Sequence, residues 1–152
     1  MAMNTRILKE LYESSEENFG ITVLKLKGED LLPLVTLLKD ECGFDLLLDV
    51  TAVDYPDCEL RFEVVYHLYS SRHNRRLRLK VPVPESCPAV PTLTGLYGSA
   101  CYAERETHEM YGIEFSGNGD LRPILLYEGF DGHPLRKDYP IDGEQPIVAY
   151  RK

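Results

Sequence analysis

The sequence contains no tryptophan, and none of its four cysteines lies in a C-x-x-C spacing. Isolated cysteines do not match the usual ligand spacings of zinc or iron–sulfur sites, so we interpret them as buried free thiols. The histidines fall on different predicted elements, which also argues against a metal site. The cysteines are Cys42, Cys58, Cys87 and Cys101, and the histidines are His67, His73, His108 and His133.

Long apolar runs and positive charge are also scarce. The longest nearly uninterrupted apolar run, residues 31–38, contains Pro33 and is far shorter than the roughly 20 residues that span a bilayer. A net charge of -8 opposes attraction to nucleic acid or anionic lipid. The first residues turn acidic where a signal peptide would turn apolar, so we expect the chain on the cytosolic side of a membrane.

The common catalytic signatures H-E-x-x-H, G-x-S-x-G, G-x-x-x-x-G-K-[ST] and G-x-G-x-x-G are absent. Glu104 and His108 lie four positions apart on a predicted helix, as do Arg105 and Glu109, so each pair can meet on the helix surface. A Glu–His pair can serve as a general acid/base unit. The alternative is a local ion pair worth a few tenths of a kcal/mol, or a contact to a partner.

Hydrophobic periodicity predicts one α+β domain, a two-layer sandwich of an antiparallel or mixed sheet with helices on one face. The apolar run at 44–53 indicates a central strand covered on both faces. Residues 84–99 are rich in proline and predict a stiff connector. The predicted helices are 4–18, 29–42 and 100–111, with Ser99 as N-cap of the last, and the predicted strands are 21–27, 44–53, 61–69 and 76–83.

After a predicted helix stop at Gly112, residues 113–140 are punctuated by glycine and proline yet remain rich in apolar side chains. Long irregular segments in compact domains are usually functional or disordered, and this apolar content favours an ordered, docked segment. We therefore divide the domain into residues 1–99, the two-layer part with its connector, and residues 100–152, a helix with an extended irregular docking segment.

Two groups of basic residues stand out. Arg105, Arg122 and Arg136 lie among apolar neighbours and should need carboxylate partners. Candidates close in sequence are Glu104, Glu106, Asp120, Asp131 and Asp138. The second group either protects an edge strand against aggregation or binds an acidic protein; it consists of Arg72, Arg75, Arg76, Arg78 and Lys80.

The back third of the chain resembles a known family, the 30-kDa subunit of respiratory complex I, which is the C subunit of bacterial NADH–quinone oxidoreductases. The resemblance rests on E-R-E at 104–106, Y-G-I at 111–113, Phe115, Gly117, D-L-R at 120–122 and G-F-D-G-H-P-L-R-K-D-Y-P at 129–140. It covers about 37 contiguous residues closely and the rest of the chain weakly. Relatives in membrane-bound, energy-converting [NiFe] hydrogenases and in ferredoxin- or formate-linked complexes share this signature more loosely.

The resemblance implies a non-catalytic structural subunit in the peripheral arm of an NADH–quinone oxidoreductase, docked on the 49-kDa-like, hydrogenase-type subunit at the cytoplasmic side of the cell membrane. NAD, FMN, iron–sulfur clusters and quinone, or a NiFe centre, would then lie in partner subunits. The alternatives are the equivalent subunit of a hydrogenase-type complex and a free-standing acid/base enzyme using Glu104 and His108. The expected partner-binding residues are Glu104, Arg105, Glu106, Asp120, Leu121, Arg122, Phe130, His133, Pro134, Leu135, Arg136, Lys137, Asp138 and Tyr139.

Overall fold

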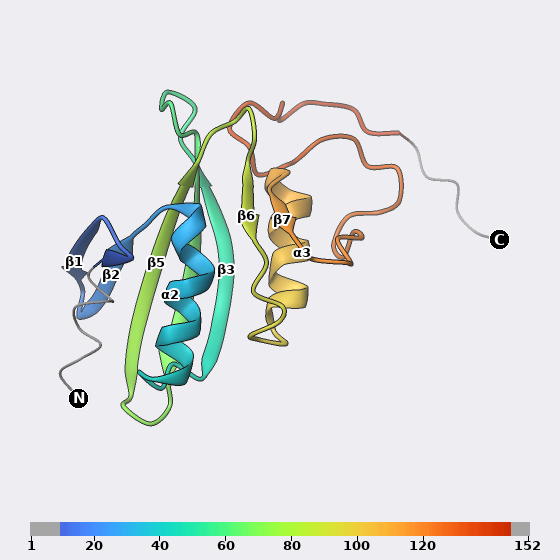
Figure 1. Cartoon of the computed structure of the whole chain (residues 1–152). Helices are drawn as coiled ribbons and strands as arrows, with labels where there is room; N and C mark the ends of the chain where they lie inside the picture. Colours follow the sequence, from blue (N-terminus) through green and yellow to red (C-terminus); the bar gives the residue numbers. More distant parts are fainter. Residues whose placement is uncertain (1–9, 147–152) are drawn as a thin grey trace.

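The structure, a computed structural model, describes residues 10–146 (Figure 1). It has the predicted α+β architecture, with a mixed five-stranded sheet in the order β1-β2-β5-β4-β3 and a second sheet of β6 and β7. The strands are β1 Ser14–Asn18, β2 Ile21–Lys25, β3 Leu46–Asp54, β4 Phe62–Ser70, β5 Arg75–Val83, β6 Ala89–Pro91 and β7 Glu114–Ser116, and the helices are α2 Gly28–Asp40 and α3 Ala100–Tyr111.

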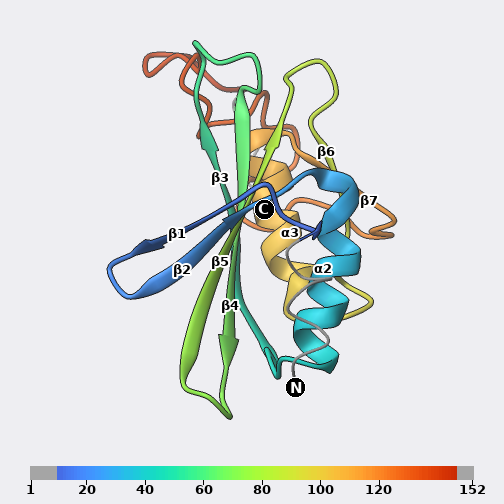
Figure 2. The same cartoon turned by 60° about the vertical axis from the view of Figure 1, so that its left-hand side comes forward.

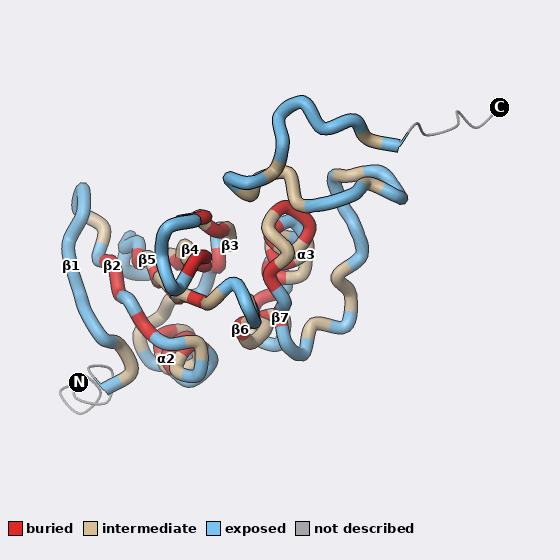
Figure 3. The backbone as a smooth tube through the Cα atoms, turned by 90° about the horizontal axis from the view of Figure 1, so that it is seen from above, coloured by how far each residue is buried: buried red, intermediate tan, exposed pale blue. Residues whose placement is uncertain are grey.

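The centre of the sheet follows from alternating apolar residues in β4 and β5, which pair antiparallel as predicted. β5 also pairs in parallel with β2. α2 follows β2 in the chain and crosses one face of the sheet before β3 begins. α2 buries Leu31, Leu34, Val35 and Leu38 against that face, and Pro33 is tolerated near its start. The opposite face of the five-stranded sheet carries no helix within residues 10–146, as Figures 1 and 3 show.

The predicted helix at 4–18 is wrong over its second half. Residues 14–18 form β1, which pairs antiparallel with β2, and residues 4–9 lie outside the described part of the chain. Phe19 and Gly20, with φ of 50° and 75°, make the left-handed pair of a two-residue hairpin turn. Figure 2 shows this hairpin leaning away from the side of the sheet that α2 covers.

The prediction of a central strand at 44–53 is also wrong, because β3 lies at the edge of the sheet. Its apolar character has a different cause, since α3 packs along this edge. The Thr107 and Ser99 hydroxyls donate hydrogen bonds to the carbonyls of Val50 (2.8 Å) and Leu47 (2.9 Å). The helix thus satisfies edge carbonyls that would otherwise face water.

The proline-rich connector contributes to the core rather than leaving it. β6 pairs in parallel with β7, and Val90, Leu93 and Tyr97 are buried. α3 follows with the predicted bounds and ends at Gly112 in the left-handed conformation, with φ of 73°. Ser99 precedes α3 but makes no side-chain cap hydrogen bond, because its hydroxyl is engaged by β3.

Candidate docking surface

A buried carboxylate on α3 holds the start of the irregular segment. Glu104 is fully buried and accepts hydrogen bonds from the Thr92 hydroxyl (2.6 Å), the Leu93 N–H (2.7 Å) and the Asn118 amide (2.9 Å). Three donors are what a buried carboxylate needs to offset its desolvation. Glu104 thereby ties the connector before α3 to the chain that follows β7.

A second glutamate on the same helix holds the middle of the segment. Glu109 is 7% exposed, and its carboxylate accepts three consecutive backbone N–H groups, those of Ile124 (3.2 Å), Leu125 (2.9 Å) and Leu126 (2.8 Å). Hydrogen bonds to an ionised acceptor are stronger than those between neutral groups. Glu109 therefore fixes the path of a stretch that has no strand partner within residues 10–146.

Side chains from residues 133–136 bind carbonyl groups at the C-terminal end of α3. The ring Nδ1 of His133 lies 2.9 Å from the Glu109 carbonyl, and Arg136 donates its Nε–H to the Tyr111 carbonyl at 2.7 Å. A Cβ at Gly112 would lie 2.5 Å from both the Arg136 Nη2 and the His133 Nε2 atoms. Glycine is favoured here, because a side chain would be strained by the left-handed turn and would displace Arg136 and His133.

A buried arginine next to the sheet binds the residues that directly follow this turn, 137 and 138, through a network of carboxylates. Arg61, at the start of β4, contacts both carboxylate oxygens of Asp54 (2.8 and 3.0 Å), Glu85 (2.6 Å) and Asp138 (2.8 Å). The Lys137 N–H also donates to Asp54 at 2.7 Å. Arg61 and Asp54 are almost completely buried, so this network links the ends of β3 and β4 to residues 137 and 138.

The charges in this network stabilise one another. The hydrogen bonds from Arg61 lower the pKa of the Asp54 carboxyl, although burial alone would raise it. The Arg61 hydrogen bond also lowers the pKa of Asp138. The Asp54 and Asp138 carboxylates in turn raise the pKa of Arg61, so all three groups are ionised at neutral pH.

A more exposed cluster shapes residues 120–123. The Asp120 carboxylate accepts hydrogen bonds from Arg122 at 2.7 and 2.8 Å, which lowers the pKa of Asp120. Arg105 donates to the carbonyls of Arg122 (2.9 Å) and Pro123 (3.1 Å) and lies 4.0 Å from the Asp120 carboxylate. Arg122 itself is 81% exposed, so it remains available to a partner.

Between these fixed points the segment exposes apolar side chains. Leu125 is 62% exposed and Leu135 50% exposed, with Ile124 and Tyr127 each at 38%. The loop between β3 and β4, which the Arg61 network places beside residues 137 and 138, adds exposed Tyr55 and Leu60. We call residues 118–141 with this loop the docking surface, since ordered apolar side chains at a surface are typical of protein interfaces.

Within residues 10–146, no three histidine, cysteine, aspartate or glutamate side chains come together as metal ligands. The prediction of buried thiols is wrong for Cys58 and Cys87, which are exposed, whereas Cys42 and Cys101 are half-buried. None of the helices in that part of the chain is both long enough and apolar enough to cross a membrane.

Residues 24–145 match the family model described as "Respiratory-chain NADH dehydrogenase, 30 Kd subunit". The chain belongs to this family. The resemblance seen in residues 104–140 is thereby confirmed for the greater part of the chain, including the sheet, where the sequence signal is weak.

Relatives of the 30 Kd subunit family support the assignment. The C 1 subunit of the NADH-quinone oxidoreductase of Rhizobium etli (strain CIAT 652) is 50% identical over 135 residues, which cover 88% of this chain and 67% of that protein. The C subunit of the same enzyme from Methylobacterium radiotolerans is 48% identical over 127 residues, covering 82% and 59%.

Two solved structures share the fold. The trypsin-resistant fragment (1-134) of Nqo5 has a TM-score of 0.67 at 36% identity and covers 77% of this chain and 98% of the fragment. A chain of the membrane-bound sulfane sulfur reductase, an archaeal respiratory membrane complex, has a TM-score of 0.75 at 25% identity, covering 90% and 83%. The α+β fold of the 30 Kd subunit family is therefore the fold of this chain.

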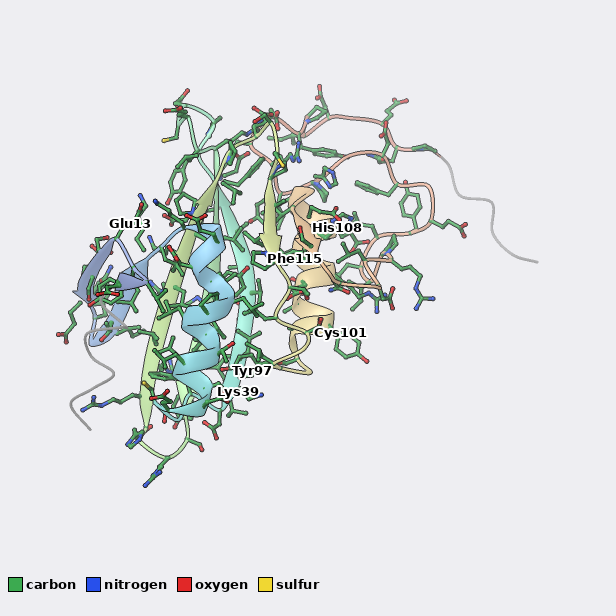
Figure 4. All side chains as sticks on the ribbon, in the orientation of Figure 1. Glu13, Lys39, Tyr97, Cys101, His108 and Phe115 are labelled. Carbon is green, nitrogen blue, oxygen red and sulfur yellow. The ribbon has the colours of Figure 1, made fainter. Side chains whose placement is uncertain are left out.

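The two side-chain pairs predicted on α3 do not form. Glu104 points into the protein, whereas the His108 ring, near the C-terminal end of α3 in Figure 4, lies 2.8 Å from the Ile113 carbonyl. Arg105 and Glu109 each bind the backbone of the later segment instead of one another. Burial and complete hydrogen bonding leave the Glu104 carboxylate without access to a substrate.

The prediction that Arg105, Arg122 and Arg136 pair with carboxylates is confirmed for the first two residues. Arg122 and Arg105 both find Asp120, the latter at the limit of an ion pair. Arg136 makes no ion pair within the described residues; its guanidinium lies over the Phe62 ring, 5.0 Å from the centroid, where cation–π attraction replaces a carboxylate.

The expected partner-binding residues fall into two groups in the structure. One group is exposed and available for contact: Glu106, Arg122, Leu135, Lys137 and Asp138. The other group is buried or half-buried and shapes the surface from below: Glu104, Arg105, Asp120, Leu121, Phe130, His133, Pro134, Arg136 and Tyr139. Their role in binding stays a prediction.

Sequence reasoning missed Arg61, Asp54 and Glu109 as determinants of this surface. Apart from the contact between Arg61 and Asp54, seven positions apart, these residues bind groups far away in the sequence, and none stands in an unusual local pattern. Glu109 could have been suspected, because a carboxylate at the last turn of a helix opposes the helix dipole and needs another reason to be there.

Proposed function

We propose that this chain is a non-catalytic subunit of an NADH–quinone oxidoreductase complex, and that its docking surface binds the 49-kDa-like, hydrogenase-type subunit. On this proposal the chain sits peripherally at the cytoplasmic side of the membrane. NAD, FMN, iron–sulfur clusters and quinone lie in partner subunits.

The observation that carries the proposal is the way in which residues 118–141 are ordered. Glu109 holds their backbone, and Glu104 and Arg61 bind the side chains of Asn118 and Asp138, while Leu125 and Leu135 remain exposed. Preorganised apolar side chains lower the entropic cost of binding a partner. A free-standing enzyme gains nothing from such a surface.

The equivalent subunit of another membrane-bound respiratory complex is the second candidate. It is favoured by the likeness to the chain from the archaeal sulfane sulfur reductase. The higher identity to the C subunits of NADH-quinone oxidoreductases favours the first candidate. Purifying the native assembly and identifying its flavin, clusters and nickel content separates the two.

The docking role is tested with matched leucine substitutions. We expect Leu125→Asp and Leu135→Asp to leave the fold intact but to remove the chain from the purified complex, because each places a charge in an apolar interface. Leu32→Asp is the control, since Leu32 is 41% exposed on α2 and lies outside the docking surface. Retention of all three variants at the level of the unsubstituted chain would refute the docking role.

A further inference from the structure

The face of the main sheet that no helix covers within residues 10–146 contains a groove distinct from the docking surface. Two adjoining concavities of about 780 and 270 Å³ share Ile21, Leu48 and Arg76 in their walls. The β1–β2 hairpin leans toward this face, as Figures 2 and 3 show, and its residues Glu17 and Phe19 to Thr22 contribute to the lining of the groove. Asn74 and Arg75 of the β4–β5 hairpin also line the groove. Figures 1 and 2 show this hairpin at the end of the sheet away from residues 131–146.

The apolar part of the groove is unusually exposed. Leu46 is 46% and Leu48 52% exposed, and Phe19 at the hairpin tip is fully exposed. The register of the sheet sets Leu46, Tyr69 and Arg76 side by side across β3, β4 and β5. Since neighbouring residues in a sheet register point to the same face, Leu46, Tyr69 and the basic Arg76 share one row on this face.

The positive charge of the groove is only partly neutralised. Its lining includes three arginines, Arg75, Arg76 and Arg78, against two carboxylates, Glu17 and Asp49. None of the three arginines makes an ion pair within the described part of the chain. The groove lining thus carries a net positive charge, whereas the whole chain has a net charge of -8.

Arg78 adds an independent sign of a missing acceptor. Val23 is the register partner of Arg78 in β2, and Val65 lies on the same face of β4; both are buried although they lie outside the main core. The Nε atom of Arg78 is shielded from solvent and has no hydrogen-bond partner in the described residues. A shielded donor without an acceptor costs free energy, which a bound carboxylate recovers once the Arg78 side chain turns toward the groove.

We infer that this groove binds an acidic segment of a second partner protein, which places a carboxylate on Arg76 and Arg78 and an apolar side chain against Leu46 and Leu48. A planar carboxylate matches the fork of a guanidinium. Nucleic acid does not fit, because the net charge of the chain repels a polyanion. A short segment with one or two carboxylates beside apolar side chains satisfies both halves of the groove.

This inference rests on the proposed function only in that the chain works inside a multi-subunit complex. It gives the protein two separate contact surfaces, the docking surface and the groove, and so a bridging position between two proteins. The two surfaces can be tested independently in one experiment.

The first measurement is modification of arginines by phenylglyoxal in the isolated chain and in the purified complex, read by mass spectrometry. We expect Arg76 to react about tenfold more slowly in the complex, as for an arginine in an interface. An unchanged rate at Arg76 overturns the groove proposal. Arg122 reports separately on the docking surface, so its failure to be protected counts against the proposed function and not against the groove.

The second measurement identifies the chemistry of the partner. The Arg76→Lys variant keeps the charge and introduces an amine that a carbodiimide can join to a carboxylate in direct contact. We expect a new amide link from residue 76 to an aspartate or glutamate of another protein in the complex. A link only to Glu17 or Asp49 of the same chain overturns the proposal. Protection of Arg76 that is lost on removing lipid, without any new link, assigns the groove to an anionic headgroup and also overturns it.

Discussion

Glu109→Gln is the substitution that most directly tests how the docking surface is ordered. The side chain keeps its size and one carbonyl oxygen, but it loses the charge and replaces the other oxygen with an NH₂ group. The remaining oxygen can serve the Ile124 and Leu125 N–H groups as a neutral acceptor. The Leu126 N–H, now 2.8 Å from the carboxylate, would face a donor.

The magnitude follows from the three hydrogen bonds. A hydrogen bond to a charged group contributes about 1.5–3 kcal/mol, and a neutral one about 1 kcal/mol. Losing one bond and the charge assistance of two others therefore costs about 3 kcal/mol once partial hydration of the opened segment is allowed for. That cost corresponds to roughly a hundredfold more frequent opening of residues 124–126.

Amide hydrogen exchange measures this opening residue by residue. We expect the amides of residues 124–126 to exchange up to roughly a hundredfold faster in Glu109→Gln, while the amides of β4 and β5 keep their rates. Glu106→Gln is the matched control, because Glu106 lies on the same helix but is exposed and makes no hydrogen bond in the described residues. Exchange at residues 124–126 that stays within about twofold of the unsubstituted chain would show that the carboxylate does not order the segment.

Three further predictions concern the groups that hold the same surface. Asp54→Asn should reduce the free energy of unfolding at pH 7 by about 3 kcal/mol, because it breaks a buried pair with Arg61. Since the pKa of Asp54 is lowered in the folded state, the ionised carboxylate contributes fully to stability above about pH 4, and this contribution disappears as the pH falls through the folded pKa. Urea unfolding should therefore show the free energies of unfolding of the unsubstituted chain and of Asp54→Asn converging in acid. A difference that stays constant with pH would contradict a stabilising role for the ionised carboxylate. Gly112→Ala should cost at least about 1 kcal/mol more than Gly129→Ala, because both residues have positive φ but only a Cβ at position 112 meets other side chains; equal melting temperatures would count against this close approach. Trypsin should cut the isolated chain between residues 112 and 140 before it cuts within residues 1–83, and equal resistance of both regions would argue against a segment that a partner completes.

The sequence was sufficient for those elements whose signals are local. The alternation in β4 and β5, the amphipathic pattern of α2 and the glycine stop of α3 each depend on neighbouring residues, and each appears in the structure close to its predicted bounds. The hairpin of β1 and β2 was harder to predict. Its first strand is exposed along its whole length, so it carries no hydrophobic period to identify it.

The site depends on contacts between distant parts of the chain, which local patterns do not encode. Asp54 meets Lys137 across 83 positions, and the hydroxyl of Thr107 reaches the carbonyl of Val50 across 57. The spacing of Glu104 and His108 predicted a surface pair, but the helix turns Glu104 inward because connector and loop supply three donors there. Which face of a helix is buried depends on the segments that pack against it, not on the spacing of two residues along it.

The anchoring of residues 124–126 through their main chain has a consequence for how such a protein can change. Amide groups are common to every residue except proline, so Glu109 places almost no demand on the identity of the three side chains that it positions. Those side chains can be exchanged for others that suit a different neighbour while the loop keeps its shape. One scaffold can in this way serve respiratory assemblies of different composition.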